Sequence, residues 1–156
     1  MIRKLLVALD GSPRARTVLF AAADLAEAFH ATMDLLRVIT IPPDFPAAAH
    51  TPLGDPLPAY MEREAYEAMR GLLSSLPRIP LCQLRVRHGA HPWRTILDVA
   101  DETEANVIII GSHGYHAIDR LIGTTAGRVA NMARRNVFVI HNFEPRAGSF
   151  PASVDP

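Results

Sequence analysis

Apolar residues follow two patterns along this chain, and each pattern predicts one kind of secondary structure. Continuous apolar runs at 5–9 and 107–110 are typical of strands in a parallel sheet that is covered on both faces, and two further strands are predicted at 32–39 and 137–140. Between 82 and 87 apolar and polar residues alternate, which predicts a further strand with one solvent-facing side. This strand belongs at an edge of the sheet, whereas the runs at 5–9 and 107–110 belong in the middle.

The stretches between these strands repeat apolar residues at helical spacing. The first predicted helix has Ser12 as its N-cap and Pro13 at its first position, and it extends to about Phe29. The second spans 59–76, the third follows the connection at 88–92, and the fourth ends at 134–136, where Asn136 suits a left-handed cap. The predicted buried faces are, helix by helix, Val18, Ala22, Leu25, Ala26 and Phe29; Met61, Ala65, Ala68, Met69, Leu72, Leu73 and Leu76; Trp93, Ile96, Leu97 and Ala100; Ala126, Val129, Ala130 and Ala133.

Strands and helices alternate from the start of the chain to residue 140. This order predicts an α/β fold with five parallel strands in a doubly wound, Rossmann-like sheet, helices on both faces and the strand order 3-2-1-4-5. When the first and fourth strands are central neighbours, a crevice opens at their carboxyl ends. Asp10 and Gly111 both lie at that edge of the sheet.

Two segments interrupt the regular pattern. Residues 41–58 contain six prolines and are expected to be an irregular loop, which either covers the mouth of the sheet, contacts a partner subunit or is a tolerated surface insertion. Residues 142–156 are expected to form a loosely ordered tail. The remaining residues, 1–141, predict a single domain that includes the proline-rich loop.

Composition excludes several classes of partner. The 156-residue chain has a formal net charge of zero, so nothing favours nucleic acid or an anionic membrane. No apolar run reaches membrane-spanning length, and a single cysteine, Cys82, fits a reducing compartment. We therefore expect a cytoplasmic protein. Cys82 has no base beside it and is expected to be a small core residue rather than a nucleophile.

Glycines and hydroxyls gather after the strand at 107–110. The loop begins with Gly111-Ser112-His113-Gly114, and after eight residues Gly123-Thr124-Thr125 precedes the fourth helix. Free N–H groups at a helix N-terminus hold a phosphate without any lysine. The only lysine, Lys4, starts the first strand at the opposite end, and neither a P-loop nor a dinucleotide-binding motif is present.

These residues resemble the universal stress protein family, and the resemblance covers 5–140. It rests on the strand that ends in Asp10-Gly11-Ser12, the loop at 111–114, the Gly123-Thr124 step and the closing strand at 137–140. The nucleotide-binding branch of that family has nine residues between Gly114 and Gly123, where this chain has eight. It also often has a hydroxyl where this chain has Ala126.

The resemblance implies an adenine nucleotide alpha hydrolase-like fold that binds ATP or a related adenine nucleotide, with Mg or Mn as an optional companion. Adenine and ribose would lie near Ala8, Asp10 and Val38. The phosphates would lie along Gly111, His113, Gly114, Gly123, Thr124 and Thr125. The resemblance also implies a homodimer through Val137, Phe138, Val139 and Ile140, since pairing would cover the exposed apolar edge of that strand.

Other candidate ligands have weaker support in the sequence. His88 and His91 lack a nearby carboxylate or thiolate and make a poor metal site, so no metal ligand is predicted. His116 is expected to be solvated, and Arg120 and Arg128, although within reach of phosphates, are expected to be surface residues.

Three functions remain open from the sequence. The favoured one is a nucleotide-dependent regulatory module of the stress response, because no residue is dedicated to activating water and no catalytic residue is predicted. The first alternative is a slow ATPase or an enzyme that phosphorylates or adenylylates itself. The second is a dimeric interaction protein that has lost nucleotide binding.

Overall fold

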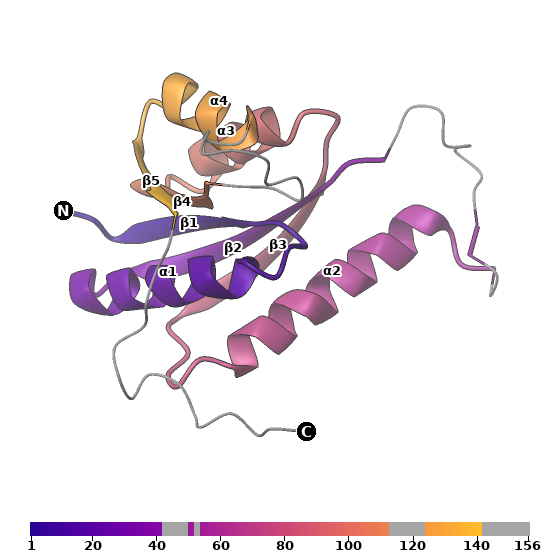
Figure 1. The fold of residues 1–156 in the computed structure, drawn as a ribbon, viewed down its shortest axis with the longest axis horizontal. Coiled ribbons are helices and arrows are strands. Elements are labelled where there is room, and N and C mark those ends of the chain that lie inside the picture. The colour runs from indigo at the N-terminus through magenta and orange to yellow at the C-terminus, as the bar shows by residue number, and fades with distance from the viewer. Residues whose placement is uncertain (42–49, 52–53, 113–123, 142–156) are drawn as a thin grey trace.

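The computed structural model describes residues 1–41, 50–51, 54–112 and 124–141. Five parallel strands form one sheet in the order β3-β2-β1-β4-β5, which confirms the predicted fold and strand order (Figure 1). The strands are β1 (Lys4–Leu9), β2 (Thr32–Ile39), β3 (Cys82–His88), β4 (Val107–Gly111) and β5 (Asn136–Ile140).

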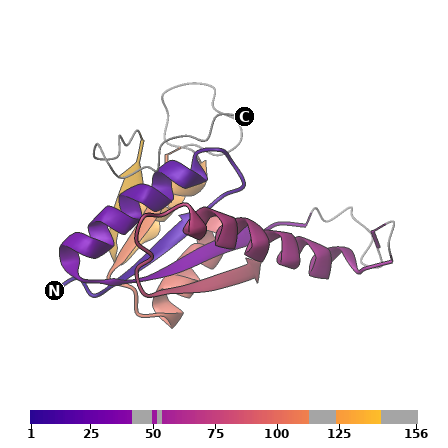
Figure 2. The ribbon, with the colours of Figure 1, turned by 90° about the horizontal axis from the view of Figure 1, so that it is seen from below.

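Helices cover both faces of this sheet (Figures 1 and 2). The helices α1 (Ala15–Phe29) and α2 (Leu57–Ser74) pack on one face, and α3 (Pro92–Glu102) and α4 (Thr124–Met132) pack on the other. Successive residues of each strand point to opposite faces, so the sheet contributes to two separate hydrophobic cores. Val7 and Ile109 belong to the α1–α2 core, and Leu6 and Ile108 belong to the α3–α4 core.

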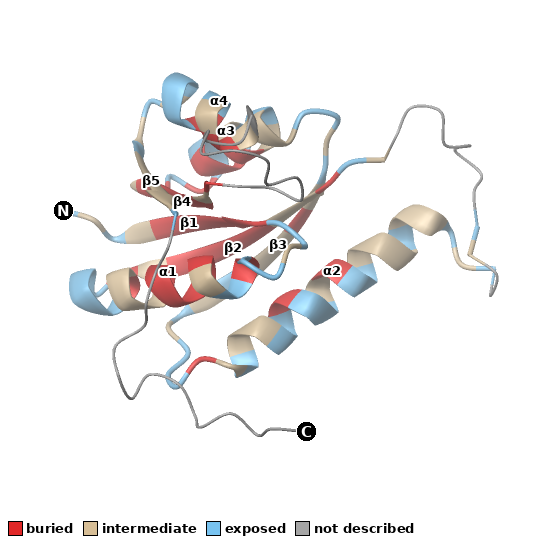
Figure 3. Cartoon of the chain, viewed as in Figure 1, coloured by how far each residue is buried: buried red, intermediate tan, exposed pale blue. Residues whose placement is uncertain are grey.

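The two central strands are the most buried part of the molecule, as Figure 3 shows. Leu5, Leu6 and Val7 of β1 and 107–109 of β4 have no exposed surface. Burying a side chain of this size contributes about 1.5–3 kcal/mol. The unbroken apolar runs at 5–9 and 107–110 therefore correspond to strands that are covered on both sides, whereas the run at 137–140 lies in the edge strand β5 and is only partly buried.

The edge strand β3 has the two-sided character that its alternation predicts. Val86 is buried against the α1–α2 core. On the other side Arg85 meets Asp34 of β2, which is only 2% exposed. Arg85 Nε donates to Asp34 Oδ2 at 3.0 Å, and Lys4 Nζ lies 3.8 Å from the same oxygen. The sequence pattern did not predict this buried ion pair, whose partners lie 51 residues apart.

The start of α1 differs from the prediction. The helix begins at Ala15 with Arg14 at its N-cap, whereas the sequence suggested Ser12 as N-cap and Pro13 as first residue. Ser12 instead donates its backbone N–H and its hydroxyl to Asp10 Oδ1, at 3.0 and 2.6 Å. These two hydrogen bonds hold Ser12 in a turn with Asp10, so the helix begins at Ala15 rather than at Pro13.

Several predicted burial and cap positions were also wrong. Phe29 is 41% exposed, and Ala68 and Ala130 are exposed rather than buried. Asn136 is the first residue of β5 rather than a helix cap, since α4 ends at Met132. For Phe29, Ala68 and Ala130 the buried stripe of the helix is narrower than the periodicity suggested.

The described parts of the proline-rich segment contain some regular structure. His50 and Pro56 form an isolated antiparallel bridge, and α2 begins at Leu57, inside the range that was expected to be irregular. The rest of this segment, and the tail at 142–156, lie outside the described residues. No helix in the part of the chain that the structure describes has both the length and the hydrophobicity to cross a membrane.

Cys82 lies at the start of β3, where it packs against the α1–α2 core. Burial raises the pKa of its thiol from 9.0 to about 11, and nearby Asp34 adds to this effect, while a backbone hydrogen bond with Leu35 opposes it. The raised pKa favours the neutral thiol, which fits the prediction of a core residue rather than a nucleophile.

We expect Cys82 to react slowly with a thiol reagent in the folded protein at pH 8. The folded thiol should hold about a hundredfold less thiolate than an unfolded thiol of pKa 9.0. Since the folded pKa is the higher one, the stability contributed by the neutral thiol is present below pH 9 and is lost as the pH rises towards 11. Labelling rates in buffer and in urea between pH 8 and 11 test this, and equal rates at pH 8 would contradict it.

Candidate functional site

The predicted nucleotide site lies at the carboxyl edge of the central strands. Leu9 pairs with Arg37, and Ala8 pairs with Ile110. Extending this register by one residue beyond the pairs places Asp10 level with Val38. Strands β1, β2 and β4 therefore end together, and their terminal residues form one rim.

Ala8 and Val38 belong to the same face of this rim. Both pack against the α3–α4 core, Ala8 with 8% of its surface exposed and Val38 partly buried. They therefore form an apolar wall below the edge. Such a wall suits a flat apolar ring better than a charged group.

Asp10 provides the exposed carboxylate of the rim. Its Oδ1 atom accepts both hydrogen bonds from Ser12, so the turn orients the side chain. Among the described residues, Oδ2 has no hydrogen-bond partner and stays available to a ligand. An oriented carboxylate with one available oxygen can accept a hydrogen bond from a hydroxyl group, as acidic residues do from ribose in other nucleotide sites.

Gly111 closes β4 and packs directly below α1. A Cβ atom on Gly111 would lie 3.1 Å from Val18 Cγ2, so Val18 would have to shift to admit a side chain in this close-packed contact. Of the described glycines only Gly54 has a positive φ, so Gly111 is not needed here for a left-handed backbone. Its observed role is the close approach of strand and helix. The phosphate role that the resemblance implied remains a prediction.

The glycine-rich loop is described at its two ends only. Ser112 is 2% exposed and donates its N–H to the carbonyl of Ile140 at 2.9 Å, which fixes the start of the loop against β5. Thr124 and Thr125 are the first residues of α4, as the prediction requires for a helix N-terminus at this edge. The predicted ligand residues His113, Gly114 and Gly123 lie outside the described residues.

Arg37 is a rim residue that was not predicted from the sequence. Its Nη2 atom lies 2.6 Å from the position that a Cβ atom of Gly11 would occupy. The guanidinium therefore covers the turn that carries Asp10, and it brings a positive charge to the edge. Its place directly before Val38, at the end of a predicted strand, was the signal that could have identified it.

His88 and His91 belong to different layers of the fold. His88 Nε2 lies 2.6 Å from Glu62 Oε1 on α2, whereas the His91 ring stacks on Trp93 of α3 with 6.4 Å between centroids. The two rings do not converge on one point. Within the described ranges, no three His, Cys, Asp or Glu side chains gather as they would around a metal ion.

The sequence is similar to a known protein family and to a named member of it. The sequence matches the Universal stress protein family over residues 1–141. Universal stress protein A homolog 1 of Coxiella burnetii is 27% identical over 139 residues, which cover 88% of this chain and 95% of that protein.

Two solved structures extend this result. Universal stress protein UspA from Lactobacillus plantarum has a TM-score of 0.68 and 28% identity, covering 88% of this chain and 97% of its own. The universal stress protein from Archaeoglobus fulgidus in complex with dAMP has a TM-score of 0.59 and 23% identity, covering 89% and 98%; at that identity the likeness shows the fold alone. Since the family match extends over nearly the whole chain, this protein belongs to the universal stress protein family.

Proposed function

We propose that this protein binds ATP or a related adenine nucleotide at the carboxyl ends of β1 and β4 and acts as a nucleotide-dependent regulatory module. The observation that carries the proposal is the shared rim. The apolar wall of Ala8 and Val38, the oriented Asp10 carboxylate and the N-terminus of α4 all occur at one edge of the sheet. The dAMP complex of the Archaeoglobus fulgidus protein supports an adenine ligand.

The three parts of the rim suit three parts of a nucleotide. Adenine would lie on the apolar wall, and ribose hydroxyls would donate to Asp10 Oδ2. The phosphates would lie at the glycine-rich loop and the start of α4, where free N–H groups and the helix dipole favour negative charge. A divalent ion, Mg or Mn, would accompany the phosphates and shield them from Asp10. We place this activity in the cytoplasm.

Calorimetric titration with ATP, with and without magnesium, tests the proposal. We expect Gly114→Val and Gly123→Val to weaken ATP binding at least about tenfold, which corresponds to about 1.4 kcal/mol. Gly71→Ala is the matched control, because Gly71 lies on α2 with nothing within 4 Å of its added Cβ. No detectable ATP affinity, or equal affinity in folded glycine variants, would contradict the proposal.

The role of Asp10 has its own test. Asp10→Asn keeps the acceptor for Ser12 and removes the charge that faces the ligand. We expect this variant to weaken the binding of ATP about tenfold or more, as for the loss of other hydrogen bonds to charged groups. Its affinity for 2′,3′-dideoxy-ATP, which lacks the ribose hydroxyls, should be unchanged. Equal losses for both ligands would show that Asp10 does not contact ribose.

Turnover of bound ATP within minutes, lost in His113→Ala, would instead indicate an enzyme.

We further propose a homodimer through β5. This strand is an edge of the sheet, and each of its residues from Val137 to Ile140 is only partly buried. Pairing with a second copy would cover the unpaired backbone and the apolar side chains together. Light scattering should then give twice the 17.1 kDa mass of the chain, and a monomer at micromolar concentration would contradict this proposal.

A further inference from the structure

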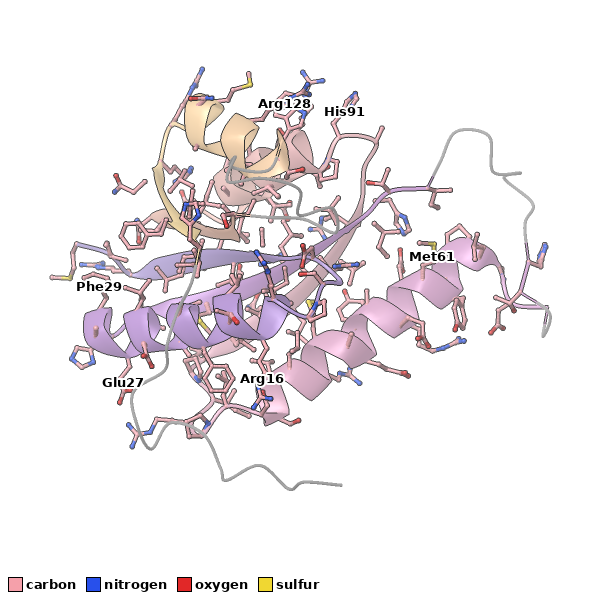
Figure 4. All side chains as sticks on the ribbon, viewed as in Figure 1. Arg16, Glu27, Phe29, Met61, His91 and Arg128 are labelled. Carbon is pink, nitrogen blue, oxygen red and sulfur yellow. The ribbon has the colours of Figure 1, made fainter. Side chains whose placement is uncertain are left out.

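An aromatic and cationic cluster lies where α3 and α4 meet. Its members are His91, Trp93, Arg94 and Arg128, and we call it the Trp93 cluster. The Arg94 guanidinium lies 5.9 Å from the centroid of the Trp93 ring, and the Arg128 guanidinium lies 5.7 Å from it. His91 stacks on the same ring. Two arginines from different helices therefore share one aromatic partner, and Figure 4 labels His91 and Arg128 at this end of α3 and α4.

The Trp93 cluster lies near the edge of the sheet that carries the candidate nucleotide site. Trp93 is the second residue of α3, which starts directly after the connection that leaves β3 at its carboxyl end. Arg128 follows Thr124 by four residues on α4, a displacement of about 6 Å along the helix axis. Because helical side chains tilt towards the N-terminus, Arg128 extends back towards the predicted phosphate position.

The charges of this cluster are not compensated by the described residues around it. Across the described ranges, Arg94, Arg128 and His91 have no carboxylate within 4 Å. Other arginines of the protein do have such partners, for example Arg85 and Arg135. Cation–π contact places each guanidinium group beside the Trp93 ring without neutralising its charge.

The indole N–H of Trp93 adds a hydrogen-bond donor to the two guanidinium groups. Its Nε1 atom is buried and has no hydrogen-bond partner among the described residues. A buried donor without a partner is unfavourable and uncommon in folded proteins. A ligand with several acceptor oxygens would satisfy the indole N–H and both guanidinium groups, which are suited to bidentate contact with phosphate.

We infer that the Trp93 cluster is a phosphate-binding site that holds the terminal phosphates of the bound nucleotide. The inference rests on the proposed function, and it extends that function from a general adenine nucleotide to a ligand with a polyphosphate chain. The chain would run from the start of α4 along the α3–α4 junction to Arg94 and Arg128. The cluster then selects ATP over AMP.

Titrations of wild type and of the double variant Arg94→Met/Arg128→Met with ATP, AMP and inorganic triphosphate test this inference. We expect the double variant to lose at least about tenfold in affinity for ATP and for triphosphate and to bind AMP like wild type. Arg94→Lys/Arg128→Lys, which keeps the charge but not the bidentate fork, should retain part of the affinity. Arg70→Met, which removes an exposed arginine of α2, is the control.

Fluorescence provides a second, local measurement, because Trp93 is the only tryptophan of the chain. ATP and triphosphate should change its emission, and adenosine should not. Circular dichroism should show that the variants are folded, since Arg94 and Arg128 are both exposed.

The possible results separate the two proposals. If the double variant binds ATP as tightly as wild type, or loses ATP and AMP equally, the inference is overturned and the proposed nucleotide site is untouched. If wild type binds triphosphate through the two arginines but binds no adenine nucleotide, the phosphate site remains and the proposed function fails.

Discussion

Replacing Arg85 with methionine is expected to lower the free energy of unfolding by about 3–5 kcal/mol. Asp34 is 2% exposed, and Arg85 Nε donates to its Oδ2 atom at 3.0 Å. Without Arg85 the nearest cation is Lys4, whose Nζ lies at 3.8 Å and is partly exposed. The variant would therefore keep a buried carboxylate with only one weak partner, which is among the most destabilising changes a single substitution can make.

Urea denaturation followed by circular dichroism measures this loss, and two further variants interpret it. Arg87→Met removes a similar side chain from the same strand, but Arg87 pairs with Glu102, which is 53% exposed, so the loss should not exceed about 1 kcal/mol. The double variant Asp34→Leu/Arg85→Met removes both charges and should regain most of the lost stability. A loss in Arg85→Met no greater than in Arg87→Met would show that the buried pair contributes little.

Gly111→Ala is expected to lower the free energy of unfolding by about 1–3 kcal/mol, as overpacking of a core does. The added methyl group would lie 3.1 Å from Val18 Cγ2, so the Val18 side chain or the helix that carries it must shift slightly. Gly71→Ala is the matched control, since its methyl group meets nothing. Within the helix α2 it should raise stability by about 0.5–1 kcal/mol. The same chemical change should therefore have opposite signs at the two positions.

A double-mutant cycle with Val18→Ala identifies the cause of the loss. In that background the methyl group on Gly111 has room, so its cost should largely disappear, with a coupling energy of about 0.5–3 kcal/mol. An equal cost in both backgrounds would exclude the contact with Val18 as the cause. Measuring ATP affinity in the double variant then separates packing from ligand binding, because the clash with Val18 is relieved while the backbone at the candidate ligand site still carries a methyl group.

The strand order could be predicted because central and edge strands differ in burial, and this difference determines their patterns of apolar and polar residues. The unbroken run at 107–110 corresponds to a strand with helices above and below it, and the alternation at 82–87 corresponds to an edge. The rim was predictable for a related reason. Parallel strands place their carboxyl ends together, so Asp10 and Gly111 were expected at the same edge once the order was known.

What could not be predicted depends on side chains that reach between distant segments. Asp34 is a charge inside an apolar run, and nothing near it in sequence indicates that Arg85 neutralises it. Arg37 over Gly11 and Arg128 over Trp93 are likewise contacts between separate elements. Periodicity describes which face of an element is buried, but it does not describe where a long arginine side chain ends.

The position of the only lysine determines how this protein can be attached to a surface. Lys4 begins β1, at the amino edge of the sheet, and its side chain is one-third exposed beside Asp34. Coupling through side-chain amines would therefore tether every molecule in the same orientation, with the carboxyl edge turned towards solution. A biosensor prepared in this way would present the candidate ligand site freely to the analyte.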